Sequence, residues 1–218
     1  VQLTQHPALD AATEGFKQAL IDKLGEENVK FDEQNASGEA TVCTTIVNSF
    51  ISKKVDLIMA NATPALQAAY NATSTIPILG TSVTEYGVAL GIDNFTGVVG
   101  TNVSGTSDLA PLDEQAAMFT ELLPDAKTVG LLYCSAEPNS EYQVKVVEEA
   151  LKAKGLTCTR FSFSDTNDVS TVTADAAAKC DALYIPTDNT AASCASTIGN
   201  IVRDRKVPVI AGEAGICE

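Results

Sequence analysis

The side chains in this sequence that are best placed for chemistry are hydroxyls, amides and a few carboxylates that directly follow short apolar runs. Thr63 follows the run 55–60, and Ser82 follows the run 76–79. Short apolar runs are typical of buried strands, and α/β sheets bind ligands beyond the carboxyl ends of their strands. No Lys or Arg falls in these loops, so we expect a ligand other than a phosphate.

The chemistry of these loops matches a zwitterion. Backbone N–H groups at helix N-termini favour an anion, so a ligand carboxylate would suit Thr63, Ser82 or Thr84. A ligand ammonium would need a carboxylate, and the second half of the chain offers Asp188 and Glu213 after its apolar runs. We therefore expect the ligand to be an amino acid.

Several of these residues also have a simpler structural role. Thr63 is expected to cap a helix, with any ligand contact additional to that role. Asp188 and Asn189 equally suit the cap of the helix that follows them, and Glu213 equally suits a solvated loop carboxylate. Capping and ligand binding can hold together.

Catalytic and metal-binding patterns are not found in the sequence. His6 is the single histidine and precedes a proline, so we expect it to contact a loop or a pocket rather than act as a general base. No P-loop, Rossmann-type glycine motif or nucleophile elbow occurs. A racemase or an amidohydrolase on this fold would need an acid–base pair, for which Asp188 and Glu213 are the available residues. We expect no catalytic residue, no metal and no cofactor.

The six cysteines form no Cys-x-x-Cys pair, and a single histidine accompanies them, which argues against a structural zinc site. Two explanations of the cysteines stay open. An even number can mean disulfides in an exported protein, whereas thiols can serve as small buried apolar groups in a reducing or anaerobic setting. We favour the thiols because the cysteines fall inside predicted strands and helices.

Composition and charge exclude several classes of partner. The chain of 218 residues has 14 Lys and Arg against 28 Asp and Glu, a net charge of −14, and its 45% hydrophobic residues are typical of a globular protein. Such an acidic chain is repelled by phosphate backbones and anionic lipids, so nucleic acid and membrane surfaces are not expected partners. No apolar run reaches the ~18–20 residues of a membrane span.

Apolar runs alternate with amphipathic segments, which predicts βαβ units with parallel sheets. Strands are expected at 1–3, 29–31, 55–60, 76–79, 128–133, 157–163, 181–186 and 207–211. Helices are expected at 8–24, 43–51, from 63, 111–122, 140–151, 168–179 and 190–205, and the segment 87–107 is expected to hold a strand and a crossing. Ser140 and Gln143 have capping-box spacing. We expect two doubly wound α/β lobes, 1–103 and 104–218.

At several places the sequence resembles a family of ABC-transporter substrate-binding proteins. The residues that carry the resemblance are Gln-His-Pro-Ala-Leu-Asp-Ala-Ala at 5–12, Asp-Leu-Ile at 56–58 leading to Ala-Thr-Pro-Ala at 62–65, and Asn139-Ser140 after Tyr133. Pro-Thr-Asp-Asn-Thr at 186–190 is the most distinctive. The resemblance covers nearly the whole chain. It implies a type 1 periplasmic-binding-protein fold, in which two flavodoxin-like lobes joined by hinge strands close on a ligand like a Venus flytrap.

The resemblance also implies a function. Members of the tryptophan or aromatic-amino-acid type bind Phe, Tyr or Trp outside the cytoplasm, as periplasmic proteins or cell-surface lipoproteins, and deliver the ligand to an ABC permease. We expect a monomer that reaches the membrane only through a lipid anchor. The alternative is a ligand-sensing effector domain of a regulator or receptor. By position, the ligand residues would be Gln5, Thr63, Pro64, Ser82, Thr84, Asn139, Ser140, Asp188, Asn189 and Glu213, with Asp108 as a further candidate.

The chain departs from the family pattern in three respects. A family member would continue for several dozen residues, so we expect the C-terminal part of the second lobe to be missing from this sequence. The usual signal and lipid-anchor cysteine are also missing, so export rests on the resemblance alone. Glu85 stands where an aspartate often sits.

Overall fold

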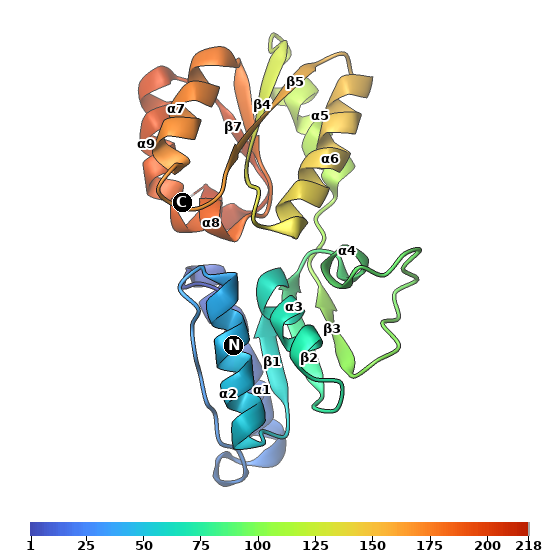
Figure 1. The fold of residues 1–218 in the computed structure, drawn as a ribbon. Coiled ribbons are helices and arrows are strands. Elements are labelled where there is room, and N and C mark those ends of the chain that lie inside the picture. Colours follow the sequence, from blue (N-terminus) through green and yellow to red (C-terminus); the bar gives the residue numbers. More distant parts are fainter. Residues whose placement is uncertain (218) are drawn as a thin grey trace. The chain divides into compact units, whose positions relative to one another are not determined.

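The computed structural model describes residues 1–217, which form two compact units, one from Val1 to Asp108 and one that begins at Leu109 (Figure 1). Each unit is an α/β structure with a parallel sheet, as the alternating pattern predicts. The expected lobe boundary between residues 103 and 104 stays a prediction. Among the described residues no helix is long and apolar enough to cross a membrane.

The sheet of the first unit has the strand order β1-β2-β3 and is parallel throughout, with strands β1 (Ile58–Asn61), β2 (Ile78–Val83) and β3 (Val103–Ser107). The predicted strands at 1–3 and 29–31 are wrong. Only isolated bridges extend the sheet beyond β1, from Gln2 to Asn61 and from Gln2 to Asn35. Charged residues directly follow 29–31, and none of its three residues is buried, so it lacks the buried faces that a strand in a parallel sheet needs.

Four α-helices accompany this sheet: α1 (Pro7–Leu24), α2 (Ala40–Lys53), α3 (Thr63–Ala72) and α4 (Tyr86–Leu90). Helix α2 turns Cys43, Ile46, Val47 and Phe50 into the core and packs against α3. The sequence did not predict α4, which is five residues long and therefore too short to show a helical period. Its cap is Glu85, whose carboxylate accepts hydrogen bonds from the backbone N–H groups of Gly87 and Val88.

The sheet of the second unit has the order β5-β4-β6-β7 and consists of β4 (Thr128–Cys134), β5 (Thr157–Phe163), β6 (Ala182–Ile185) and β7 (Val209–Ala211). The chain passes from β4 to β5 on one side and then crosses to β6 on the other side of β4. The order of the strands therefore reverses between β4 and β6, which makes their carboxyl ends the expected ligand position of this sheet.

Helices cover both faces of the second sheet. Figure 1 shows α5 (Leu112–Leu122) and α6 (Pro138–Ala153) on one side, with α7 (Val169–Lys179) and α9 (Ala195–Arg205) on the other. Because side chains alternate along a strand, Leu131 joins the core under α5 and α6, whereas Leu132 joins the core under α7 and α9. The predicted helix 190–205 is interrupted at Cys194, which separates the short α8 (Asn189–Ser193) from α9.

Two predicted helix caps are wrong. The N-cap of α6 is Glu137, so Ser140 lies inside the first turn and does not begin a capping box. The N-cap of α3 is Ala62, and Thr63 is the first helical residue. In α6 the proline next to the cap starts the helix ahead of the serine, because its fixed φ already suits the first helical turn.

The cysteines are free thiols. Cys43 and Cys134 are buried, and burial raises the pKa of each to about 11, so they act as small apolar groups. Cys217, in contrast, is exposed. No group of metal-ligating side chains occurs among the described residues.

Candidate functional site

The carboxyl ends of β4 and β6 are joined by Asp188. One carboxylate oxygen accepts a hydrogen bond from the backbone N–H of Ala191 at 2.7 Å, which caps α8 as the sequence suggested. The other accepts from the backbone N–H of Cys134 at 2.7 Å, at the end of β4. With 1% of its surface exposed, the Asp188 side chain is part of the interior and fixes the loop after β6 against β4.

The pKa of Asp188 is raised to about 7. Burial is the main cause, and the negative charge of Glu137 adds to it. Hydrogen bonds from the backbone of Ala191 and Cys134, and from the side chain of Ser140, act in the opposite direction. Asp188 is therefore a carboxyl group whose charged form is disfavoured by its surroundings.

Glu137 is the functional candidate that the sequence analysis missed. It is 3% exposed. One oxygen accepts from the backbone N–H and the side-chain amide of Asn189, at 3.1 and 2.7 Å, and the other from the backbone N–H and hydroxyl of Thr190, both at 2.8 Å. A glutamate before a proline in a polar loop looks solvated from sequence alone; its place after an apolar strand was the only available signal.

Two amides complete this arrangement. Gln143 is fully buried and holds the backbone of Thr187 from both sides, donating to its carbonyl and accepting from its N–H, each at 3.1 Å. Asn139 donates to the carbonyl of Thr187 at 3.2 Å and to Glu137 at 3.3 Å. It also donates to the Ser140 hydroxyl at 3.4 Å, so its side-chain hydrogen bonds all come from its NH₂ group, and its amide oxygen is buried without a hydrogen bond. An unpaired buried acceptor is costly, and a ligand donor would satisfy it.

The loop after β7 packs closely on the loop after β6. A methyl group at Gly212 would lie 2.5 Å from the backbone nitrogen of Thr187, so only glycine fits there. The Gly212 carbonyl accepts from Gln115 at 3.2 Å. Glu213 is partly buried, and its carboxylate accepts from the backbone N–H of Gly215 at 3.0 Å, which gives it a local structural contact.

The first unit has strained backbone at its strand ends. Ala62, between β1 and α3, has φ 87° and ψ 157°, a conformation that normally requires glycine. Ser82, near the end of β2, has φ 53°. Such strain persists where the surrounding structure imposes it, often at ligand-binding positions.

The other predicted residues of the first unit lie in separate segments of the chain. Thr63 and Pro64 are buried at the start of α3, and Thr84 is buried just after β2, where its carbonyl accepts from the Ser107 hydroxyl at 2.9 Å. Asn61 precedes Ala62, and its buried amide oxygen has no hydrogen bond. Gln5 is exposed in the segment before α1.

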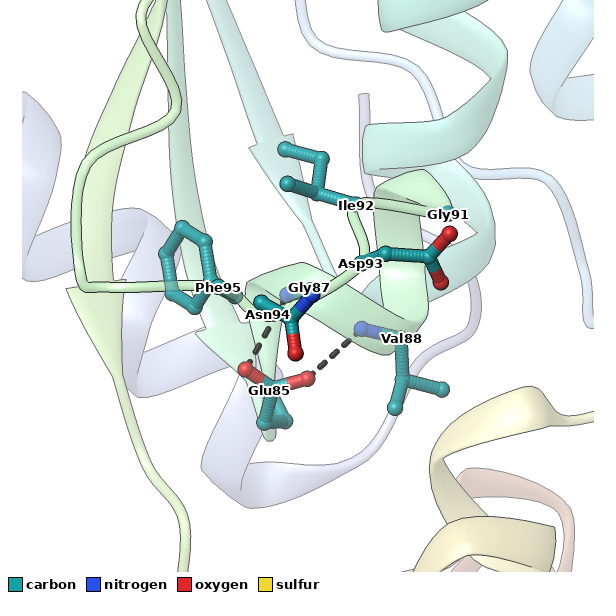
Figure 2. A pocket seen from close by; sticks show the side chains of 8 residues that line it. All are labelled: Glu85, Gly87, Val88, Gly91, Ile92, Asp93, Asn94 and Phe95. Atoms are coloured by element: carbon teal, nitrogen blue, oxygen red, sulfur yellow. Dashed lines mark hydrogen bonds between the residues drawn. The ribbon is translucent and has the colours of Figure 1, made fainter.

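A surface hollow of about 400 Å³ lies beside α4 (Figure 2). It is lined by Glu85, Gly87, Val88, Gly91, Ile92, Asp93, Asn94 and Phe95. Figure 2 shows both carboxylate oxygens of Glu85 bonded to the helix start. None of the predicted ligand residues lines this hollow, so we place the candidate site at the strand ends.

Parallel α/β units with polar groups at their strand ends are consistent with the class of type 1 periplasmic binding proteins, and the structural comparisons show this fold. A structure described as the ABC domain in complex with L-Trp, from Streptococcus pneumoniae, matches with a TM-score of 0.91 and 30% identity, covering 99% of this chain and 73% of that one. A ligand-free, open substrate binding protein with adhesive properties from Clostridium difficile matches with a TM-score of 0.65 and 40% identity, over 99% and 73% of the two chains. The predicted fold class is confirmed.

The chain belongs to the ABC transporter substrate binding protein family, whose model matches residues 1–218. Its members bind solutes and are not enzymes. A protein named tyrosine-binding protein, from Clostridioides difficile (strain R20291), is 38% identical over 216 residues, which are 98% of this chain. The chain spans 62% of the length of that relative. The resemblance inferred from the sequence is thereby confirmed.

Proposed function

We propose that this chain is the ligand-binding part of an extracytoplasmic protein that captures an aromatic amino acid and delivers it to an ABC permease. Family membership supports the general role. The observation that carries the ligand class is the 38% identity, over 98% of the chain, to a protein named for binding tyrosine. The similarity to a structure in complex with L-Trp supports the same class.

We assign the ligand carboxylate to the first unit. Helix α3 is ten residues long, begins at Thr63 and has no side-chain hydrogen bond from its N-cap Ala62, so its first backbone N–H groups are suitable donors for an anion. Thr63 lies just after β1, Ser82 near the end of β2 and Thr84 directly after β2. The strain at Ala62 is consistent with a backbone held for binding.

The ligand ammonium is assigned to the second unit. The unpaired amide oxygen of Asn139 is an acceptor for the ammonium. Asp188, which is hydrogen-bonded to the end of β4, supplies negative charge near the segment that carries Asn139. Gln5, Pro64, Ser140, Asn189 and Glu213 complete the proposed ligand contacts. A ligand that binds both of the expected lobes, 1–103 and 104–218, would stabilise their closed state, because its affinity for that state is higher.

Calorimetry of the purified chain against each of the twenty amino acids tests this function. We expect Tyr, Phe or Trp to bind more tightly than Leu or Ile, and Ser82→Ala to weaken that binding. Thr45→Ala, which changes an exposed residue on α2, is the control and should bind like the unmodified chain. Absence of binding by every amino acid would contradict the proposal.

A further inference from the structure

Glu137 connects two loops that lie far apart in the sequence. It precedes α6 in the loop after β4, and it accepts hydrogen bonds from Asn189 and Thr190, the first residues of α8. Asn139, next to α6's first residue, adds a further donor. The carboxylate therefore holds the start of α8 in place, together with Asn139 and Asn189 of the proposed ligand set.

Glu137 and Asp188 form a buried pair of carboxylates, with 3% and 1% of their surfaces exposed. Their hydrogen-bond partners described above are neutral N–H and O–H groups. The other titratable group beside Asp188 is the Cys134 thiol, whose pKa of about 11 keeps it neutral at physiological pH. Two like charges in a dry space repel each other, so the charge of Glu137 opposes ionisation of Asp188.

We propose that Glu137 is a positioning residue whose carboxylate sets the conformation of the 186–190 loop for the ligand and, paired with Asp188, makes ligand affinity depend on pH. This inference rests on the proposed function, in which Asp188 provides charge for a ligand ammonium. Ionised Asp188 then favours the ligand, and protonated Asp188 does not.

The direction of the pH dependence follows from the pKa of Asp188, which burial and Glu137 raise to about 7. Affinity should rise between pH 5 and pH 7.5 as Asp188 loses its proton. Replacing Glu137 by glutamine removes the neighbouring charge and lowers the pKa of Asp188, so the half-way point of the rise should move to lower pH. A purely structural loss would weaken binding equally at every pH.

The experiment measures the affinity for L-tyrosine from pH 5 to pH 7.5 in the unmodified chain, E137Q, T190V and H6Q. We expect E137Q to bind about tenfold more weakly at pH 7.5 and to shift the half-way point down by about one pH unit, a change worth about 1.4 kcal/mol in the energy of the charged form. T190V removes one donor to Glu137 but keeps both charges, so it should weaken binding without lowering that point. H6Q is the control for the single histidine of the chain and should keep the unmodified profile, because the proposal assigns the pH dependence to Asp188.

A ligand-free measurement separates this inference from the proposed function. Asp188 has a folded-state pKa above its unfolded value of 3.8, so the stability it contributes is present below that value and is lost as pH rises towards 7. Denaturation of the ligand-free chain should show this loss, and in E137Q the loss should end at lower pH. Absence of binding in the unmodified chain refutes the proposed function. An E137Q profile that matches the unmodified chain, in either measurement, overturns the inference, as does loss of the pH dependence in H6Q.

Discussion

At the scale of single residues, the buried polar groups of the second unit explain why its loops can be rigid. Each oxygen of Asp188 accepts a backbone N–H, one from the end of β4 and one from the start of α8. Hydrogen bonds to a charged acceptor are strong, and an unpaired buried donor is costly. The capping and binding roles considered for Asp188 are therefore compatible, because the cap fixes the loop that would contact the ligand.

Replacing Asp188 by alanine should weaken amino-acid binding by about tenfold or more, because it removes a negative charge and leaves two buried N–H groups unpaired. Calorimetry with L-tyrosine measures the change. Asp175→Ala is the matched control: this exposed aspartate pairs with Lys179 on α7, and surface pairs contribute little. Unchanged affinity in the Asp188 variant would remove that residue from the site.

At the scale of elements, the close contact between the loops after β6 and β7 should contribute to the free energy of unfolding. Gly212→Ala forces a methyl group against the backbone of Thr187 and should lower the free energy of unfolding by roughly 1–3 kcal/mol. Gly199→Ala, within α9, meets nothing within 4 Å and should raise it by roughly 0.5–1 kcal/mol. Chemical denaturation of both variants gives the comparison; equal effects would show that the loops can move apart.

Most elements could be predicted from the sequence because their apolar periods are strong. The strand at 157–163 has the predicted bounds, and the helix predicted at 8–24 begins one residue earlier. The failures have local causes: α4 is shorter than a recognisable period, and the segment 29–31 has no second buried face. The break at Cys194 leaves the helical pattern around it unchanged, so periodicity could not show it.

Part of the site could also be predicted, since residues after parallel strands meet at one edge of a sheet. That reasoning found Asp188, Asn139 and Ser140, which the structure brings together through the ends of β4 and β6. It missed Glu137 and the role of Gln143, because their burial depends on contacts with a loop more than 40 residues away in sequence. Local sequence patterns cannot predict contacts between residues so far apart in the chain.

At the scale of the whole molecule, the net charge of −14 and the few buried carboxylates have separate roles. Most of the acidic side chains keep the surface charged, which disfavours nucleic acids and anionic lipids as partners. The two buried carboxylates of the second unit, in contrast, would provide negative charge for the ammonium of one small ligand. The specificity of the proposed function thus rests on a small part of the total charge.

The most direct test of the account is mass spectrometry of the small molecule that is released when the purified chain is denatured. We predict a free aromatic amino acid, recovered chemically unchanged and in an amount close to one per chain. Recovery of a different class of molecule, or of a product formed from an added amino acid, would contradict the assignment of this chain as an amino-acid-binding protein.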